Sequence, residues 1–297
     1  TAGGRGGGPG EFTGLSGLGS SPDGGVWAYD FSLRRLTWMD GSGGITGFTT
    51  LGPLPPTLNP VGALNDGTFL LKQLWGTRTG HESYGEGLRR DPLAYVRFDR
   101  EGVLVDTVGT FPGREIMVWD EDGRAVMGTP PYGRNSAATL WQGNLVVGSQ
   151  ESYELEVLTP DGELIRRIGL DSPVRELGAA DLEAYIQGRL AATPPERRGG
   201  LREQIEAMEM PPTHPAYGTL LSDRAGNLWV SEWAQYPQLP ERWTVLDSDG
   251  RWLGEVVMPP RFFPSDIGED WILGVQKDDM DVEYVVVYPL VKPTGSS

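Results

Sequence analysis

The chain has 297 residues, of which 38% are hydrophobic and ten are tryptophan, so it can bury a sizeable core. Its formal charge of −16 disfavours nucleic acids and anionic membranes as partners, because both attract proteins through Lys and Arg. The absence of cysteine excludes disulfides and thiolate chemistry, and no apolar run approaches the roughly 20 residues that a membrane helix needs.

The chain starts at Thr1 without a methionine or a signal-like segment, so we expect a processed product or a fragment. A Gly-rich stretch, GGRGGGPGEF, follows at residues 3–12. Beyond it, a polar turn with glycine comes before an apolar run at five places, namely Gly24, Gly67, Gly143, Gly226 and Gly268. The intervals between these glycines are about 43, 76, 83 and 42 residues. Two intervals therefore match a four-stranded propeller blade, which takes roughly 40–45 residues.

The two longer intervals contain segments that look inserted. Gly-, Pro- and charge-rich stretches occupy residues 76–90 and 112–131, and helix-like sequence fills residues 173–212. Removing these segments restores the repeat period. Within 174–210, Leu182, Tyr185, Ile186 and Leu190 have helical spacing, and TPPE at 193–196 is typical of a helix start. We expect two short helices there, either as padding on the rim or as a lid or docking element.

Each unit also carries a second turn with Asp-Gly or a similar pair, as in LEVLTPDGELIRRIG. Such turns between runs of Val, Ile, Leu and Trp predict tight hairpins, because glycine accepts positive φ. The fold class predicted is therefore all-β, a β-propeller of four-stranded antiparallel blades with a helical insertion, forming one domain over 1–297. A β-sandwich or two separate β domains are the alternatives, but neither needs this repeat period.

Two segments resemble known propeller families. VWAYDFSLRRLTWMD is similar to the core of NHL-type blades, and the C-terminal half, from GNLWVSEW to VVVYPL, resembles bacterial six-bladed propeller proteins that are largely uncharacterised. The resemblance implies a fold of six blades and a periplasmic or extracellular location. Only five units are visible, and the last, Phe263 to Pro293, has three strands. We therefore expect either a further blade upstream of Thr1 or a five-bladed ring that closes imperfectly.

Catalytic motifs are absent from the sequence: it has no P-loop, dinucleotide fingerprint, nucleophile elbow or HExxH. The only histidines, His81 and His214, are not spaced for zinc, and no local sequence supports a Ser-His-Asp triad around either. The carboxylates of KDDMDVE, Asp278 to Glu283, could hold a single Ca²⁺, but a solvated hairpin loop is favoured. We expect no cofactor.

Blade topology predicts where a ligand would bind. In a meander, the loops entering the first strand and leaving the second emerge on one face, around the central channel. Leaving loops contribute Lys72 and Gln150, among others, and the binding residues predicted on this face are Asn135, His214, Tyr217, Glu232, Trp233 and Asp266. Polar and aromatic groups of this kind suit a protein, a peptide or a small polar ligand. The net charge favours a neutral or cationic one.

Two functions follow from this reading. The first is a non-catalytic binding or interaction propeller of the bacterial cell envelope. The alternative is a metal-dependent lactonase or related hydrolase of the gluconolactonase-like type, whose members hold one divalent cation with Glu, Asn and Asp. In this chain Glu232, Asn135 and Asp266 could take those places by position only.

Overall fold

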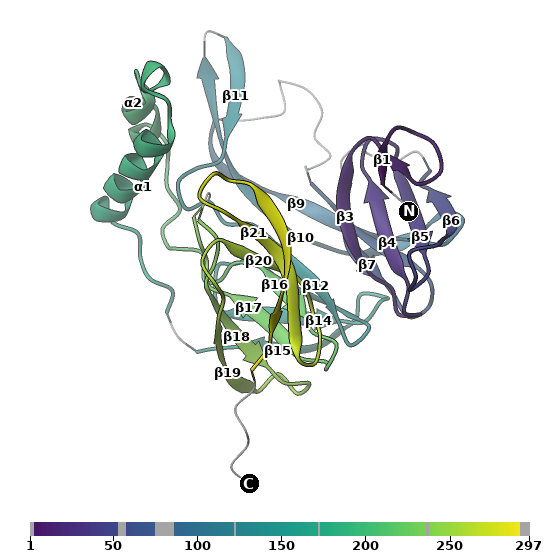
Figure 1. Ribbon diagram of the computed structural model, residues 1–297. Coiled ribbons are helices and arrows are strands. Elements are labelled where there is room, and N and C mark those ends of the chain that lie inside the picture. The colour runs from purple at the N-terminus through teal and green to yellow at the C-terminus, as the bar shows by residue number, and fades with distance from the viewer. Residues whose placement is uncertain are drawn as a thin grey trace.

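A computed structural model describes residues 3–52, 58–74, 86–121, 123–171, 173–235 and 238–291 (Figure 1). Five antiparallel sheets follow one another along the chain, and in each sheet the strands are hydrogen-bonded in sequence order. This is the arrangement of propeller blades. A short parallel pair, β1 (Gly4–Arg5) with β2 (Glu11–Phe12), precedes the first sheet.

The strands of the five sheets have the following bounds. The first sheet has β3 (Leu15–Ser20), β4 (Val26–Asp30), β5 (Arg35–Met39) and β6 (Ile45–Thr50). The second has β7 (Leu58–Ala63), β8 (Phe69–Gln73), β9 (Gly87–Phe98), β10 (Leu104–Glu121) and β11 (Arg124–Gly128). The third has β12 (Ala137–Trp141), β13 (Asn144–Gly148), β14 (Glu154–Leu158) and β15 (Leu164–Gly169). The fourth has β16 (Leu220–Ser222), β17 (Leu228–Ser231), β18 (Arg242–Leu246) and β19 (Trp252–Val257). The fifth has β20 (Phe262–Ile267), β21 (Trp271–Lys277) and β22 (Glu283–Pro289).

The five predicted turns all join the first two strands of a sheet. Gly24, Gly67, Gly143 and Gly226 have φ between 74° and 85°, the left-handed region that glycine adopts without strain. At Gly268 the constraint is instead contact, since a Cβ there would meet Trp271 at 2.3 Å. The repeat read from these glycines is therefore a repeat of sheets.

The two predicted insertions of the second unit run into its sheet. Residues 76–85 lie outside the described residues, and 87–90 belong to β9. Residues 112–131, expected to be an inserted stretch, contain the end of β10 and all of β11, which pair from Met117 with Gly128 to Glu121 with Arg124. The strands β9 and β10 stay paired as far as Gly87 with Val118, and β10 continues with β11 as a hairpin that projects from the sheet (Figure 1). The expectation failed because Gly113 and Pro112 coincide with a register shift inside β10, not with its end.

Four apolar clusters hold neighbouring sheets together. One joins the first and second sheets around Trp27, Trp38 and Phe69, with T-shaped ring contacts at 4.9 and 5.8 Å. The others join the second sheet to the third, the third to the fourth, and the fourth to the fifth. Each sheet is thus covered on the face turned toward its neighbour in sequence.

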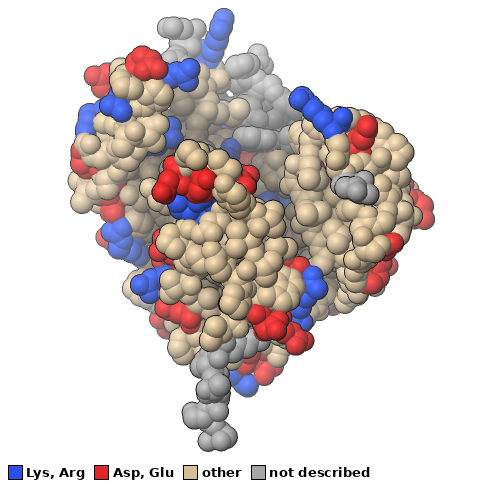
Figure 2. Space-filling model, viewed as in Figure 1, with Lys and Arg blue, Asp and Glu red and all other residues tan. Residues whose placement is uncertain are grey.

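The first and fifth sheets each keep one face that is covered only in part. In the first sheet, Leu18 and Phe48 lie opposite the face of Trp27 and Trp38 and are 63% and 42% exposed. In the fifth sheet, Val285 and Val287 on β22 are 78% and 60% exposed. Figure 2 shows the fifth sheet as a broad area without charged side chains, with a hollow between it and the first sheet. Among the described residues, no apolar cluster joins these two sheets.

In the sequence, the third and fourth sheets are separated by three helices. They are α1 (Ala179–Ala192), the 3-10 helix η2 (Pro195–Arg197) and α2 (Leu201–Glu206). The two α-helices bury Ile186 and Ile205 and are bridged by Arg202 and Glu183 at 2.8 Å. They stand beside the sheets and not within them (Figure 1). In the described part of the chain, neither these nor any other helix is long and apolar enough to cross a bilayer.

Candidate functional site

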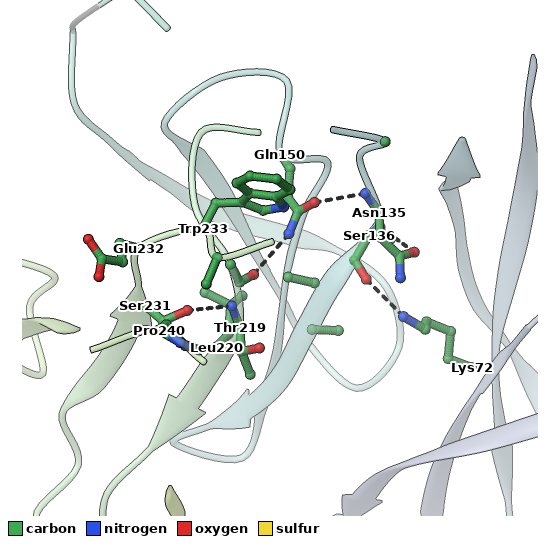
Figure 3. A pocket seen from close by; sticks show the side chains of 15 residues that line it. Lys72, Asn135, Ser136, Gln150, Thr219, Leu220, Ser231, Glu232, Trp233 and Pro240 are labelled. Atoms are coloured by element: carbon green, nitrogen blue, oxygen red, sulfur yellow. Dashed lines mark hydrogen bonds between the residues drawn. The ribbon is translucent and has the colours of Figure 1, made fainter. Parts of the chain in front are cut away.

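A cavity of about 360 Å³ lies where the second, third and fourth sheets meet (Figure 3). Its wall comes from the ends of β8, β13 and β17 and from the segments that lead into β12 and β16. These are the loops that leave second strands and enter first strands, so the structure brings together the face that topology predicted. The lining consists of Lys72, Gly133, Asn135, Ser136, Ala137, Ala138, Gln150, Gly218, Thr219, Leu220, Ser231, Glu232, Trp233, Ala234 and Pro240.

The floor of the cavity is fixed by hydrogen bonds within and between the third and fourth sheets. Gln150 accepts a hydrogen bond from the Asn135 backbone N–H at 2.7 Å and donates its Nε2 to the Gly218 carbonyl at 3.0 Å. Ser231 Oγ accepts from the Thr219 N–H at 2.8 Å. Because both ends of the Gln150 amide are used, this side chain joins the third and fourth sheets and holds the wall rigid.

Lys72 reaches the cavity from the second sheet. Its Nζ donates to the Ser136 carbonyl at 2.8 Å (Figure 3). Loss of hydration lowers the pKa of this ammonium to about 8, and no carboxylate among the described residues pairs with it. Lys72 is one of only three lysines in the chain, beside Lys277 and Lys292.

Trp233 forms the opposite wall and is backed by the helical insertion. Its ring lies 5.2 Å from that of Tyr132 and 6.3 Å from that of His214. His214 Nε2 lies 3.2 Å from Asp181 Oδ1 at the start of α1, and the Tyr132 hydroxyl donates to the Asp181 carbonyl at 3.0 Å. The side chain that lines the cavity is therefore packed against the residues that dock α1.

The charged groups where α1 docks, Asp181 and Arg175, are paired with each other. A hydrogen bond from Arg175, at 2.6 Å, lowers the pKa of Asp181 to about 2. Burial, with the nearby Arg175 charge, lowers the pKa of His214 below its usual value. His214 is therefore neutral near pH 7 and donates its Nε2–H to the ionised Asp181.

The carboxylate of Glu232 is turned away from Lys72. It accepts hydrogen bonds from the backbone N–H groups of Glu241 at 3.3 Å and Arg242 at 3.2 Å. In Figure 3 the two side chains lie at opposite ends of the cavity. The Glu232 carboxylate therefore binds the start of β18 and does not neutralise the ammonium of Lys72.

The six predicted binding residues separate into three groups. Asn135, Glu232 and Trp233 line the cavity, and His214 lies directly behind Trp233. Tyr217 is buried beneath the cavity, where its hydroxyl accepts from the Gln150 N–H and donates to the Glu154 carbonyl, both at 3.3 Å. Burial raises the pKa of Tyr217 to about 12.

Asp266 lies elsewhere. It falls inside β20 and not in the loop that enters this strand, next to the turn at Gly268. Its carboxylate is 2.7 Å from the guanidinium of Arg224, in the turn between β16 and β17. The prediction placed Asp266 in the loop before β20. It was wrong because β20 already begins at Phe262, so Asp266 lies near the end of this strand.

The ligand set considered for a divalent cation is therefore not assembled. Asn135 and Glu232 line one cavity, whereas Asp266 is paired with Arg224. Within the described ranges, no group of three or more His, Asp or Glu side chains is placed to hold a metal ion. Asp278 is used by its own turn, accepting from the N–H groups of Met280 and Val282. The other histidine, His81, lies outside the described residues.

Several lining groups were not among the predicted residues. Ser136, Thr219 and Ser231 contribute through backbone and hydroxyl groups that no motif marks. Lys72 lies on the predicted face but is not one of the six predicted binding residues. Its rarity in an Arg-rich chain was the available signal.

Comparison with known proteins is informative for the fold alone. No family model and no curated protein matches the sequence. A member of the DUF4221 family from Bacteroides vulgatus is similar in structure, with a TM-score of 0.51 and 14% identity over 95% of this chain and 80% of that one. A protein of unknown function from Bacteroides caccae has a TM-score of 0.38 at 12% identity, over 90% and 72% of the two chains. A virginiamycin B lyase from Staphylococcus aureus has a TM-score of 0.38 at 13% identity, over 94% and 86%. The class defined by fold and site is a propeller-like β protein with a polar cavity at one end of its inner strands.

Proposed function

We propose that this protein is a binding propeller that holds a small polar ligand, or a polar side chain of a peptide, in the cavity between its second, third and fourth sheets. The observation that carries the proposal is the convergence of Lys72, Asn135 and Trp233 on one cavity of about 360 Å³. A volume of this size suits a small organic molecule.

The lining supports binding more than catalysis. Gln150 and Ser231 are hydrogen-bonded within the wall, and His214 is held by Asp181 behind Trp233. Bound in this way, they shape the cavity and leave Trp233 as a flat apolar surface. Stacking on such a ring contributes about 0.5–1.5 kcal/mol.

A fragment screen by thermal shift and ligand-observed NMR tests the proposal. Trp233→Ala is expected to remove binding of cavity ligands while the sheets stay folded. Trp252→Ala is the matched control, since Trp252 is 67% exposed on β19 and lines no part of the cavity. Equal binding by the wild type and Trp233→Ala would contradict the proposal.

We further propose a six-bladed ring in the cell envelope. A sixth four-stranded sheet, supplied by residues of the same polypeptide outside Thr1–Ser297, would cover the open faces of the first and fifth sheets. The support is that both faces are apolar and that each closed interface in the protein is made by a neighbouring sheet. The longer polypeptide is then expected to bind less of the dye ANS than residues 1–297, and fractionation of the source cells should place it outside the cytoplasm.

A further inference from the structure

We propose that Lys72 and Asn135 form an anion subsite, so that the ligand of the cavity carries a carboxylate at one end and an apolar or aromatic body that lies on Trp233. This inference rests on the proposed binding function and names the class of ligand. It replaces the neutral or cationic ligand expected from the net charge.

The first support is the isolation of the Lys72 charge. Within the described ranges, its one hydrogen bond goes to a neutral carbonyl, that of Ser136. Two acids next to lining segments have arginine partners: Glu115 binds Arg134, which precedes Asn135, at 2.8 Å, and Glu151, which follows Gln150, binds Arg90 at 2.7 Å. A partly buried cation without a counter-ion is costly, and an incoming carboxylate would relieve that cost.

The second support is an amide donor beside the ammonium. The Oδ1 of Asn135 accepts from the Ser136 N–H at 2.8 Å, which assigns the orientation of the amide. Its Nδ2 has no partner among the described residues. Lys72 and Asn135 are both bonded to the backbone of Ser136, so their donors lie together at one end of the cavity (Figure 3).

The third support is the separation of charge along the cavity. The carboxylate of Glu232 is at the far end and is held by β18. Among the described residues that line the cavity, Glu232 is the only acid, so a ligand carboxylate at Lys72 meets no repelling group from them, although the chain as a whole carries −16. Charge-assisted hydrogen bonds of this kind are about twice as strong as neutral ones.

Phenylacetate and its neutral isostere phenylacetamide are the probes, measured by calorimetry against the wild type, Lys72→Met and Lys277→Met. Lys277→Met is the control, because Lys277 is paired with Glu283 at 3.2 Å on the fifth sheet. We expect phenylacetate to bind the wild type and Lys277→Met about 10-fold or more tightly than phenylacetamide, and Lys72→Met to lose this difference.

A second readout separates binding from structure. With ¹³C-labelled lysine, the three lysines can be titrated individually by NMR. Phenylacetate should raise the pKa of Lys72 and leave that of Lys277 unchanged, which a merely structural lysine would not do. Equal affinity of the two probes, no binding of phenylacetate, or an unchanged Lys72 pKa would overturn the anion subsite. Binding of neutral fragments that depends on Trp233 would still support the cavity function in that case.

Discussion

The inner sheets and the terminal sheets of this protein differ in what covers them. The second, third and fourth sheets have a neighbouring sheet on both faces, and the large side chains of their inner strands are mostly buried, although outer strands expose some, such as Trp252. The first and fifth sheets pack on one face and expose valine, leucine and phenylalanine on the other. The cavity lies among the three sheets that have neighbours on both faces. A rigid site thus sits where neighbours hold the walls from both sides, and the terminal sheets contribute none of its lining.

The largest expected effect compares two tryptophans. Trp141 is 1% exposed between the third and fourth sheets and donates to the Gly226 carbonyl at 2.7 Å. Trp141→Ala should lower the free energy of unfolding by about 3–5 kcal/mol, through lost burial and a cavity. Trp252→Ala should change it by less than about 0.5 kcal/mol. Denaturant titrations measure both, and similar losses for the two variants would contradict the distinction between a tryptophan buried between two sheets and one exposed on an outer strand.

The second prediction concerns Lys72, whose ammonium lies between the second and third sheets. Lys72→Met should raise the free energy of unfolding at pH 7 by about 1–3 kcal/mol, because it removes a cation that burial destabilises. The folded pKa of about 8 lies below the ordinary 10.5, so the unfolded chain binds more protons between these values. The free energy of unfolding of the wild type should therefore rise from pH 8 toward 10.5. The difference in this free energy between Lys72→Met and the wild type should become smaller over the same range. A gap that widens with pH would show that the pKa is not lowered.

The open face of the fifth sheet should respond differently. Val285→Asp with Val287→Asp places two charges on β22, where both side chains are exposed. We expect a change in stability below about 1 kcal/mol, with weaker ANS fluorescence and less self-association. Val146→Asp is the contrasting variant, since Val146 is 0% exposed in β13 and should not tolerate a charge. Unfolding of the β22 variant would mean that this face is covered in residues 1–297.

The smallest expected effect concerns His214. Its folded pKa is lowered, so the unfolded chain binds more protons as the pH falls below about 6.5. Docking of α1 should therefore weaken at acid pH by a few tenths of a kcal/mol, because the shift concerns a partly exposed pair, His214 with Asp181. Hydrogen exchange of α1 between pH 7 and pH 5 measures this, corrected for the intrinsic rate, with β13 as the internal reference. Greater protection of α1 at pH 5 than at pH 7 would contradict the expected loss of docking free energy at acid pH.

The sequence predicted the sheets well because their signal is local. A turn glycine between two apolar runs marks each first hairpin, and four of the five turn glycines have positive φ. The segment 112–131 was misread because Pro112 and Gly113 are typical of loops, whereas here they sit at a bulge of a continuing strand. Strand length depends on pairing with β9 and β11, which the local residues do not specify.

The site was predicted in part. Topology placed Asn135, Glu232 and Trp233 on one face, and they share one cavity. It could not show that the Glu232 carboxylate points away, or that Asp266 is paired with Arg224 at the other end of its strand. Those outcomes depend on side-chain partners from other sheets. The same limit applies to charge: −16 for the chain does not describe a cavity whose unpaired group is a lysine.

The contact between Trp233 and the docking residues of α1 makes the helices a reporter of the cavity. The Tyr132 ring lies 5.2 Å from the Trp233 ring, and the Tyr132 hydroxyl donates to the Asp181 carbonyl. A shift of Trp233 should therefore displace Tyr132 and change its contact with α1. By thermodynamic reciprocity, a ligand that favours one position of Trp233 must strengthen or weaken helix docking by the same factor that docking changes its affinity. Occupancy of the cavity should then change the rate at which a protease cuts the exposed segment between α1 and α2, far from the ligand itself.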